Sequence, residues 1–203
     1  MVSKATNILH TGIILLLLTA NAFGESGGDR AATGITVAAP MGWTQFCADH
    51  PADCASKETI GRDIVMPPQV WADLGRVNKY VNDTVKPITD AEHWGTVEKW
   101  SYPTDGYGDC EDYALQKRKM LIDAGWPQES LLMTVVKDRN NEGHAVLTVT
   151  TDRGEFILDN EITSVVPRSQ TGYRYVKRQS QTNQNQWVAV GAPSSTNATA
   201  TAR

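Results

Sequence analysis

The sequence of 203 residues contains little cysteine and no extended run of positive charge. Its three cysteines are too few for a small fold held together by disulfides, and too scattered for a four-ligand zinc site. The 19 Lys and Arg are outnumbered by 23 Asp and Glu, which gives a formal net charge of −4. Because contact with phosphates requires clustered positive charge, we do not expect a nucleic-acid-binding protein.

Long apolar segments are missing after the first 22 residues. The apolar run at 13–18 follows Lys4 and is too short to cross a bilayer. Ala20, Asn21 and Ala22 then supply the small-x-small pattern that signal peptidase recognises. We therefore expect residues 1–22 to be a cleaved export signal rather than a retained membrane anchor. The mature protein is then periplasmic or secreted and does not span the membrane.

The rest of the sequence is consistent with one domain. We expect a flexible lead-in over 23–40, a folded domain over 41–191, and a disordered, low-complexity tail over 192–203. The length and the 40% apolar content are sufficient for a single hydrophobic core.

Export affects the interpretation of the cysteines. Cys47 and Cys54 are close in sequence, and such thiols usually pair in an oxidising compartment. We expect a disulfide that closes a small loop and stabilises the fold by about 2–3 kcal/mol. The alternative is a metal site that also uses His50, but only three candidate ligands are present there. Pairing leaves Cys110 as an unpaired thiol.

The order of the periodic patterns predicts an α+β fold, with helices first and an antiparallel β-sheet after them. Apolar residues recur at helical spacing after two prolines, at Val70, Leu74, Val77, Val81 and Val85. A long loop over 88–108 and a second helix over 109–124 are expected to follow. Apolar or alternating segments then predict strands at 131–136, 145–150, 155–158, 173–177 and 187–190.

Cys110 lies at the predicted start of the second helix, after a glycine-rich segment. The free amides and the positive dipole end of a helix N-terminus favour the thiolate. The same amides could bind the oxyanion of a tetrahedral intermediate. Isolated cysteines are also common as buried core residues, so the residue pattern leaves a nucleophile and a core thiol equally open.

His144 and Asp159 lie at the open end of a predicted hairpin. A turn over 151–154 places them on the same face of the sheet, opposite each other or one diagonal apart. Alone, they could be a surface pair. A cysteine nucleophile, however, needs a base and a carboxylate that orients the base. We therefore predict a triad of Cys110, His144 and Asp159, in which an imidazolium lowers the pKa of the thiol.

Several separated motifs resemble those of the bacterial transglutaminase-like cysteine proteinases. They are the segments 108–114 (GDCEDYA), 125–127 (GWP), 144–147 (HAVL) and 158–160 (LDN), together with upstream residues around Cys47, Cys54, Asn78 and Asn82. The resemblance covers about residues 41–190. It implies a papain- or transglutaminase-like cysteine proteinase fold and a Cys-His-Asp triad at Cys110, His144 and Asp159. It also implies an exported, calcium-dependent endopeptidase that releases surface adhesins and is controlled by a membrane receptor for a cyclic dinucleotide.

Asp109 and Glu111, the two carboxylates beside Cys110, are the candidate calcium ligands. Negative charges beside a thiol oppose thiolate formation, and bound Ca²⁺, which prefers carboxylate oxygens, would cancel this effect. Asp105 is a possible further ligand. The alternative is that acidic residues in the first turn only complement the helix dipole.

These observations predict an exported cysteine endopeptidase that hydrolyses a protein substrate through an acyl-enzyme. Cys110 attacks, His144 takes and returns the proton, and Asp159 orients His144. The backbone amide of Cys110 is the expected oxyanion donor. Two alternatives stay open: acyl transfer to an amine by the same triad, and a binding module that keeps the fold without catalysis.

Overall fold

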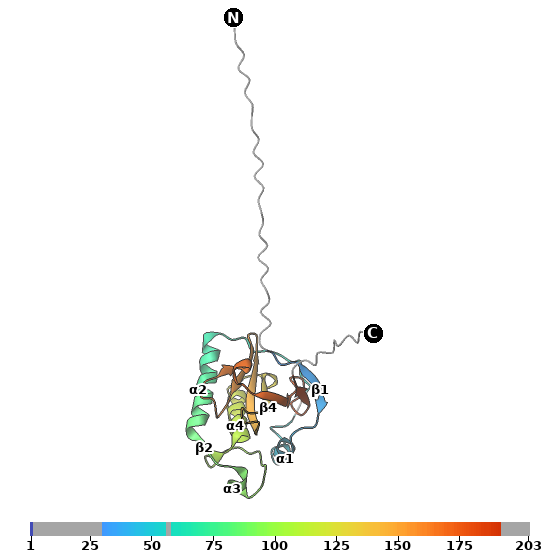
Figure 1. Ribbon diagram of the computed structural model, residues 1–203, viewed down its shortest axis with the longest axis vertical. Coiled ribbons are helices and arrows are strands. Elements are labelled where there is room, and N and C mark those ends of the chain that lie inside the picture. The colour runs from blue at the N-terminus through green and yellow to red at the C-terminus, as the bar shows by residue number, and fades with distance from the viewer. Residues whose placement is uncertain (2–29, 56–57, 192–203) are drawn as a thin grey trace, which may run out of the picture.

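The computed structural model describes residue 1 and residues 30–55 and 58–191. The expected export signal over 1–22, apart from Met1, and the expected tail over 192–203 lie outside these residues. Figure 1 shows one folded body that runs from β1 (Thr33–Val37) to β9 (Trp187–Val190). Within the described ranges, no helix combines the length and the apolar character that crossing a bilayer requires.

A seven-stranded sheet forms the centre of the described fold. Its order is β1-β9-β8-β4-β5-β6-β7, and neighbouring strands are antiparallel. The strands between β1 and β9 in sequence are β4 (Leu131–Lys137), β5 (Gly143–Thr151), β6 (Gly154–Leu158), β7 (Val166–Pro167) and β8 (Arg174–Gln179). The α+β class and each strand expected from the sequence are therefore confirmed.

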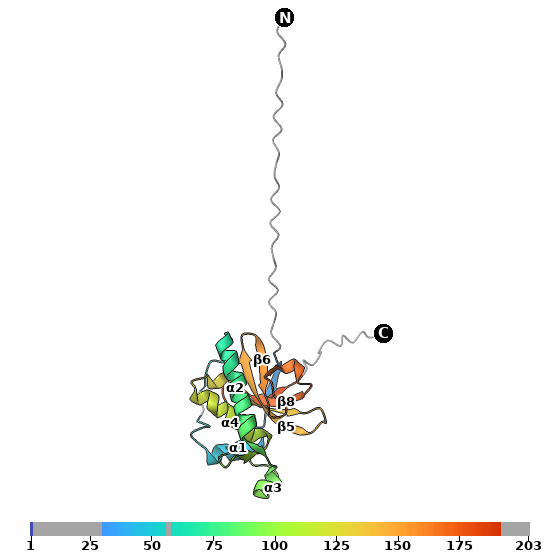
Figure 2. The same ribbon diagram turned by 90° about the vertical axis from the view of Figure 1, so that its left-hand side faces the viewer.

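Helices precede most of the sheet in the chain, as expected. They are α1 (Met41–Asp49), α2 (Pro68–Thr84), α3 (Asp90–Trp94) and α4 (Cys110–Asp123), with short 3₁₀ turns η1 (Gln128–Ser130) and η2 (Arg168–Gln170). Figure 2 shows α2 and α4 together on one side of β5, β6 and β8. The apolar stripe of α2 buries Leu74 and Val81, and α4 packs directly on β4 and β5.

Two elements differ from the expectation. β1 lies inside the segment 23–40 that was expected to be a flexible lead-in, and it pairs with β9 at the edge of the sheet. α3 lies inside the expected loop over 88–108, where Thr89 and Glu92 form a capping box at its start. Both elements have only five residues, and a periodic pattern cannot be recognised over so short a span.

The expected disulfide is present. Cys47, near the end of α1, is bonded to Cys54, and their Cα atoms are 5.4 Å apart. This pairing removes the alternative in which both sulfurs and His50 bind a metal. Cys110 is the free cysteine of the described chain.

The main core lies between the helices and the inner face of the sheet. Leu115 and Leu121 of α4 pack there with Met133, Leu147 and Leu158 of the strands. The opposite face of the sheet has a smaller apolar cluster, which consists of Val136, Val146 and Ile157. The partly buried rings of Tyr173 and Tyr175 pack against it. α4 is thus fixed at the centre of the molecule, with its N-terminus near the open end of the β5–β6 hairpin.

Candidate active site

Cys110 is the first residue of α4, and the residues before it are suited to starting a helix. Asp109 is the N-cap, and the side chain of Asp112 accepts from the Asp109 amide at 3.4 Å. A Cβ at Gly108 would lie 2.7 Å from the Asp112 side chain. Glycine is therefore required at this position, and the free thiol is fixed at the helix N-terminus.

His144 and Asp159 form a hydrogen-bonded pair across the β5–β6 hairpin. Leu147 pairs with Leu158, so His144 and Asp159 lie one diagonal apart, beyond the last pair and on the same face. Nε2 of His144 lies 2.9 Å from Oδ1 of Asp159, and both residues are buried. The turn position was sufficient to predict that the two side chains share one face of the sheet.

Asp159 is held by several further bonds. Asn78 and Asn82 of α2 fix its backbone, one accepting from the Asp159 amide at 3.1 Å and the other donating to its carbonyl at 2.9 Å. The hydroxyl of Tyr173 donates to Oδ2 at 2.7 Å. Burial alone would raise the pKa of Asp159, but the bonds and charge of His144, together with the Tyr173 hydroxyl, lower it. Asp159 therefore stays ionised behind His144.

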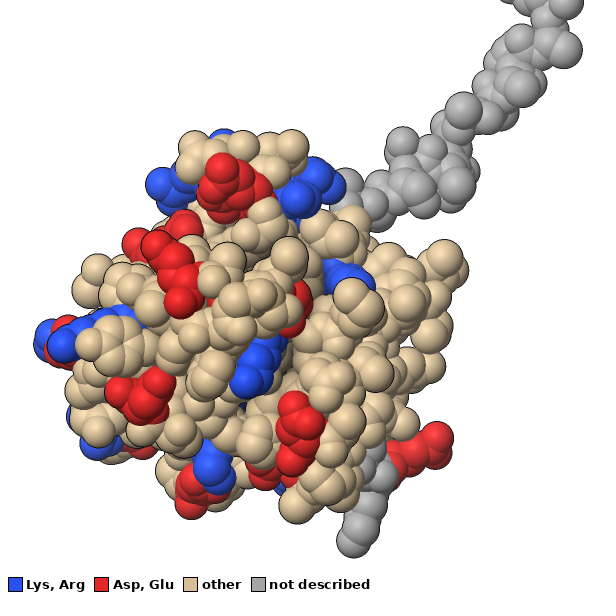
Figure 3. Space-filling view, turned by 90° about the horizontal axis from the view of Figure 1, so that it is seen from below, with Lys and Arg blue, Asp and Glu red and all other residues tan. Residues whose placement is uncertain are grey.

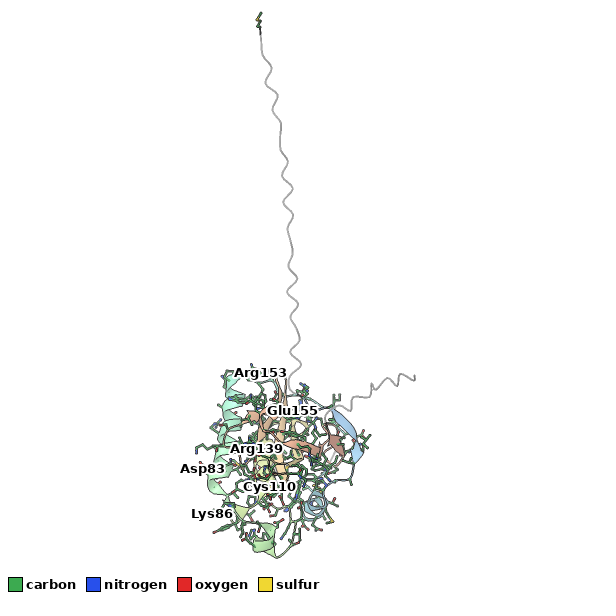
Figure 4. The ribbon with its side chains drawn as sticks, viewed as in Figure 1. Asp83, Lys86, Cys110, Arg139, Arg153 and Glu155 are labelled. Atoms are coloured by element: carbon green, nitrogen blue, oxygen red, sulfur yellow. A yellow bond between two sulfur atoms is a disulfide. The ribbon has the colours of Figure 1, made fainter. Side chains whose placement is uncertain are left out.

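Cys110 and His144 line the same crevice, which has a volume of about 320 Å³. Pro87, the last residue of β2 (Lys86–Pro87), lines it together with Thr89 and Glu92. Asn160 and Glu161 line it from the end of the hairpin. The backbone amide of Ala145, next to His144, lies close enough to the sulfur of Cys110 to act against the rise in the pKa of the thiol. Figure 4 shows Cys110 at the end of the fold that carries Lys86, away from Arg153 at the hairpin turn. The free thiol and the imidazole are therefore neighbours.

The protonation of the thiol differs from the expectation. We predicted that the helix N-terminus and an imidazolium would lower the pKa of Cys110, but the pKa is raised well above its usual value. Burial is the largest cause, followed by the charge of Glu111 and the hydrogen bond that Sγ donates to Oε2 of Glu111 at 3.1 Å. Burial first, and then the acidic side chain that faces the sulfur, therefore favour the thiol form.

Carboxyl groups crowd the start of α4. Oxygens of Asp90, Asp109 and Asp112 all lie within 4.8 Å of one another. Burial, and then neighbouring negative charge, raise the pKa of Asp112 to about 7 and also raise that of Asp90. The backbone amide of Ser101 donates to Asp112 at 2.7 Å, and that of Lys99 donates to Asp90. Asp90 and Asp112 are buried, so this is an interior cluster of carboxyl groups.

Asp109 also belongs to a second group with Cys110 and Glu111. The carboxylate oxygens and the sulfur of this group also lie within 4.8 Å of one another. The carboxyls of Asp109 and Glu111 lie close together, and burial with the charge of Asp109 raises the pKa of Glu111 to about 9. Two buried carboxyls this close are stable only if a proton or a cation offsets their negative charge. The carboxylate-rich donor set therefore suits a hard divalent cation such as Ca²⁺.

Two carboxylates of these groups, Asp90 and Asp112, were not among the ligands expected from the sequence, and the expected Asp105 does not belong to the groups. Asp90 is separated from α4 by the 88–108 segment and is brought close through β2 and its partner β3 (Tyr107–Gly108). Asp105 instead bonds Nε2 of His93 at 2.8 Å and is exposed. On the end of the molecule seen in Figure 3, acidic and basic side chains are interspersed, so no outward sign marks the buried cluster.

An α+β fold that presents a free thiol beside a buried His–Asp pair is the arrangement of a cysteine peptidase. Residues 33–195 match the family model of the bacterial transglutaminase-like cysteine proteinase (BTLCP). The chain belongs to this family and is a cysteine peptidase. No curated protein sequence matches the chain.

Solved structures of LapG from Legionella pneumophila are similar to this chain. The calcium-bound form is 26% identical, with a TM-score of 0.51 over 64% of this chain and 75% of LapG. A form treated with EGTA is 25% identical, with a TM-score of 0.49 over 62% of this chain and 73% of that one. The calcium-bound form agrees with the transglutaminase-like fold that the resemblance implied.

Proposed function

We propose that this cysteine peptidase is an endopeptidase that cleaves a protein substrate through an acyl-enzyme on Cys110. The observation that carries the proposal is the crevice shared by Cys110 and His144, with Asp159 bonded to Nε2 of the imidazole. Because Asp159 occupies Nε2, the other ring nitrogen, Nδ1, is the one that exchanges a proton with the thiol.

The chemistry follows the roles of these groups. His144 takes the thiol proton, and Sγ of Cys110 attacks the carbonyl carbon of the scissile bond. The imidazolium gives that proton to the departing amine, and water then releases the acyl group with His144 as base. The backbone amide of Cys110, at the start of α4, is the proposed oxyanion donor. Asp159 keeps the imidazole in the required tautomer.

We include a calcium site at the start of α4 in this proposal, with Asp109 and Glu111 as ligands and Asp90 and Asp112 as further ones. Their crowded carboxyl groups support it, and the related LapG has been solved in a calcium-bound form. Bound Ca²⁺ would supply positive charge beside the thiol, which lowers the energy of the thiolate.

We further propose that the protein acts in the periplasm or outside the cell, on an exported protein such as a surface adhesin, under control of a membrane receptor. The Cys47–Cys54 disulfide supports an oxidising compartment. The adhesin and the receptor rest on the family resemblance.

The test compares the full-length protein with Cys110→Ala. Each is incubated with Ca²⁺, the exported proteins of the source bacterium and a labelled primary amine, and new peptide termini are identified by mass spectrometry. We expect one or a few new termini with the unaltered protein and none with Cys110→Ala, while circular dichroism shows the same fold. Retained cleavage by Cys110→Ala would refute the role of this residue.

Two other outcomes correspond to the alternatives. Incorporation of the labelled amine without new termini would indicate acyl transfer. Neither product, combined with slow alkylation of Cys110 by iodoacetamide at neutral pH, would indicate a binding module.

A further inference from the structure

Tyr173 contacts both members of the His144–Asp159 pair from behind the crevice. Its hydroxyl donates to Oδ2 of Asp159 at 2.7 Å, and its ring lies edge-on to the His144 ring, with centroids 5.5 Å apart and an interplanar angle of 77°. We propose that Tyr173 is a positioning residue that fixes the Asp159 carboxylate and the plane of the imidazole. This inference rests on the proposed function, because it assigns a role within the same triad.

The hydroxyl completes the bonding of a buried carboxylate. Oδ1 of Asp159 is shared by His144 and by the backbone amide of Glu161, which donates at 3.0 Å. Oδ2 receives the Tyr173 hydroxyl, and the Asp159 side chain has no exposed surface that would allow water to replace it. Without the hydroxyl, a buried oxygen loses its donor, and the carboxylate can rotate to find another. Rotation of the carboxylate would move Oδ1 away from Nε2 of His144.

The fold brings Tyr173 to this place from a distant strand. Tyr173 lies just before β8, and β4 separates β8 from β5 in the sheet. Gly172, with φ of +75°, turns the chain, and Thr171 Oγ1 accepts from the Tyr173 amide at 3.2 Å. The ring packs against an apolar cluster that includes Val136 of β4. The backbone and the ring are therefore fixed independently of the hydroxyl, so removal of one oxygen tests its role alone.

The hydroxyl remains a donor at working pH. Burial, followed by the hydrogen bond and charge of Asp159, raises the pKa of Tyr173. The hydroxyl also lies 3.2 Å from Oε2 of Glu161, a longer contact than the one to Asp159. A hydroxyl has one proton, and the shorter distance identifies Asp159 as its acceptor.

Tyr175→Phe provides a matched control for Tyr173→Phe. Tyr175 packs against the same apolar cluster, and its hydroxyl bonds Thr171 at 3.2 Å and the carbonyl of Arg168 at 3.4 Å. Both variants lose one hydroxyl and keep the ring, so similar thermal unfolding is expected. Only the Tyr173 hydroxyl bonds Asp159.

The first readout is alkylation of Cys110 by iodoacetamide at pH 7 with saturating Ca²⁺. We expect the rate to fall about tenfold in Tyr173→Phe, the size that loss of a hydrogen bond to a charged group supports, and to stay unchanged in Tyr175→Phe. The second readout is the downfield NMR signal of the proton between His144 and Asp159, identified by its loss in Asp159→Asn. This signal is expected to move upfield or broaden only in Tyr173→Phe.

Equal alkylation rates and unchanged signals in the two tyrosine variants would overturn the inference. If Tyr173→Phe folds poorly, site-specific 3-fluorotyrosine at 173 tests the same bond without a change of shape, and an unmoved proton signal is then the contrary result. Alkylation of His144→Ala distinguishes a failure of the Tyr173 role from a failure of the proposed triad. Slow alkylation of that variant, with normal Tyr173→Phe, refutes only the role of Tyr173. Wild-type alkylation of His144→Ala contradicts the triad itself.

Discussion

Replacing Lys117 by methionine is expected to stabilise the protein at neutral pH. Lys117 lies on α4, is completely buried, and has no hydrogen-bond partner for its Nζ among the described residues. Burial lowers the pKa of its ammonium group from 10.5 to about 7, although the charge of Asp159 acts in the opposite direction. Its Nζ lies 5.7 Å from the centre of the Tyr113 ring, a contact that does not replace the lost hydration of a charge. A buried ammonium without a hydrogen bond destabilises the folded state, and methionine fills a similar volume without a charge.

The magnitude follows from the two pKa values. The difference between 10.5 and about 7 corresponds to about 5 kcal/mol of unfolding free energy, at about 1.4 kcal/mol per pH unit. Between these values the unfolded chain binds a proton that the folded protein does not, so stability rises with pH across this window. The destabilisation is therefore fully present at and below pH 7. Allowing for imperfect packing of the new side chain, we expect Lys117→Met to gain about 1–4 kcal/mol at pH 7.

The assay is urea unfolding of Lys117→Met and its parent at pH 7 and pH 9.5, both carrying Cys110→Ala to prevent thiol exchange at high pH. Other titrating groups cancel in the difference between the two proteins. This difference should be large at pH 7 and smaller at pH 9.5, because folding releases the Lys117 proton in this window, and that release costs less free energy as the pH approaches 10.5. A variant that is less stable at pH 7, or a difference that does not change with pH, would show that the Lys117 nitrogen is paired.

Two further predictions concern the calcium site and the disulfide. Binding of Ca²⁺ at pH 7 should release protons, because pKa values of about 9 for Glu111 and about 7 for Asp112 leave these carboxyls wholly or partly protonated without the ion. Calorimetry in buffers of different ionisation enthalpy measures this release, and a heat that does not depend on the buffer would contradict it. Cys54→Ser should lower the free energy of unfolding by about 2–3 kcal/mol, since the closed loop is short; no loss in urea unfolding would refute this estimate.

The hairpin shows how much of the site the sequence alone determines. A strand alternates its side chains between two faces, so locating the turn at 151–154 was enough to place His144 and Asp159 on one face. The start of α4 was predictable for a similar reason, since Gly108 and Asp109 are local signals for a helix cap. Both predictions depend on residues that are close in sequence or joined by one tight turn.

The remaining features depend on contacts between distant segments. Asp90 joins Asp109 through the pairing of β2 with β3, and Tyr173, just before β8, reaches Asp159 across β4 and β5. The periodicity of apolar residues in the sequence does not predict either contact. The raised pKa of Cys110 depends on burial and on the side-chain direction of Glu111, neither of which the helix position reveals.

The thiol and its acidic neighbours explain why this active site needs a cation in the proposed mechanism. Cys110 must pass its proton to His144, yet its sulfur donates a hydrogen bond to Glu111, whose carboxyl lies close to that of Asp109. Without a cation, these groups retain protons, and a thiolate would add another negative charge to a buried cluster. A divalent ion on the carboxylates replaces those protons with fixed positive charge, so the same residues that oppose the thiolate then favour it. The helix N-terminus alone does not achieve this, since the thiol pKa is raised despite its position there.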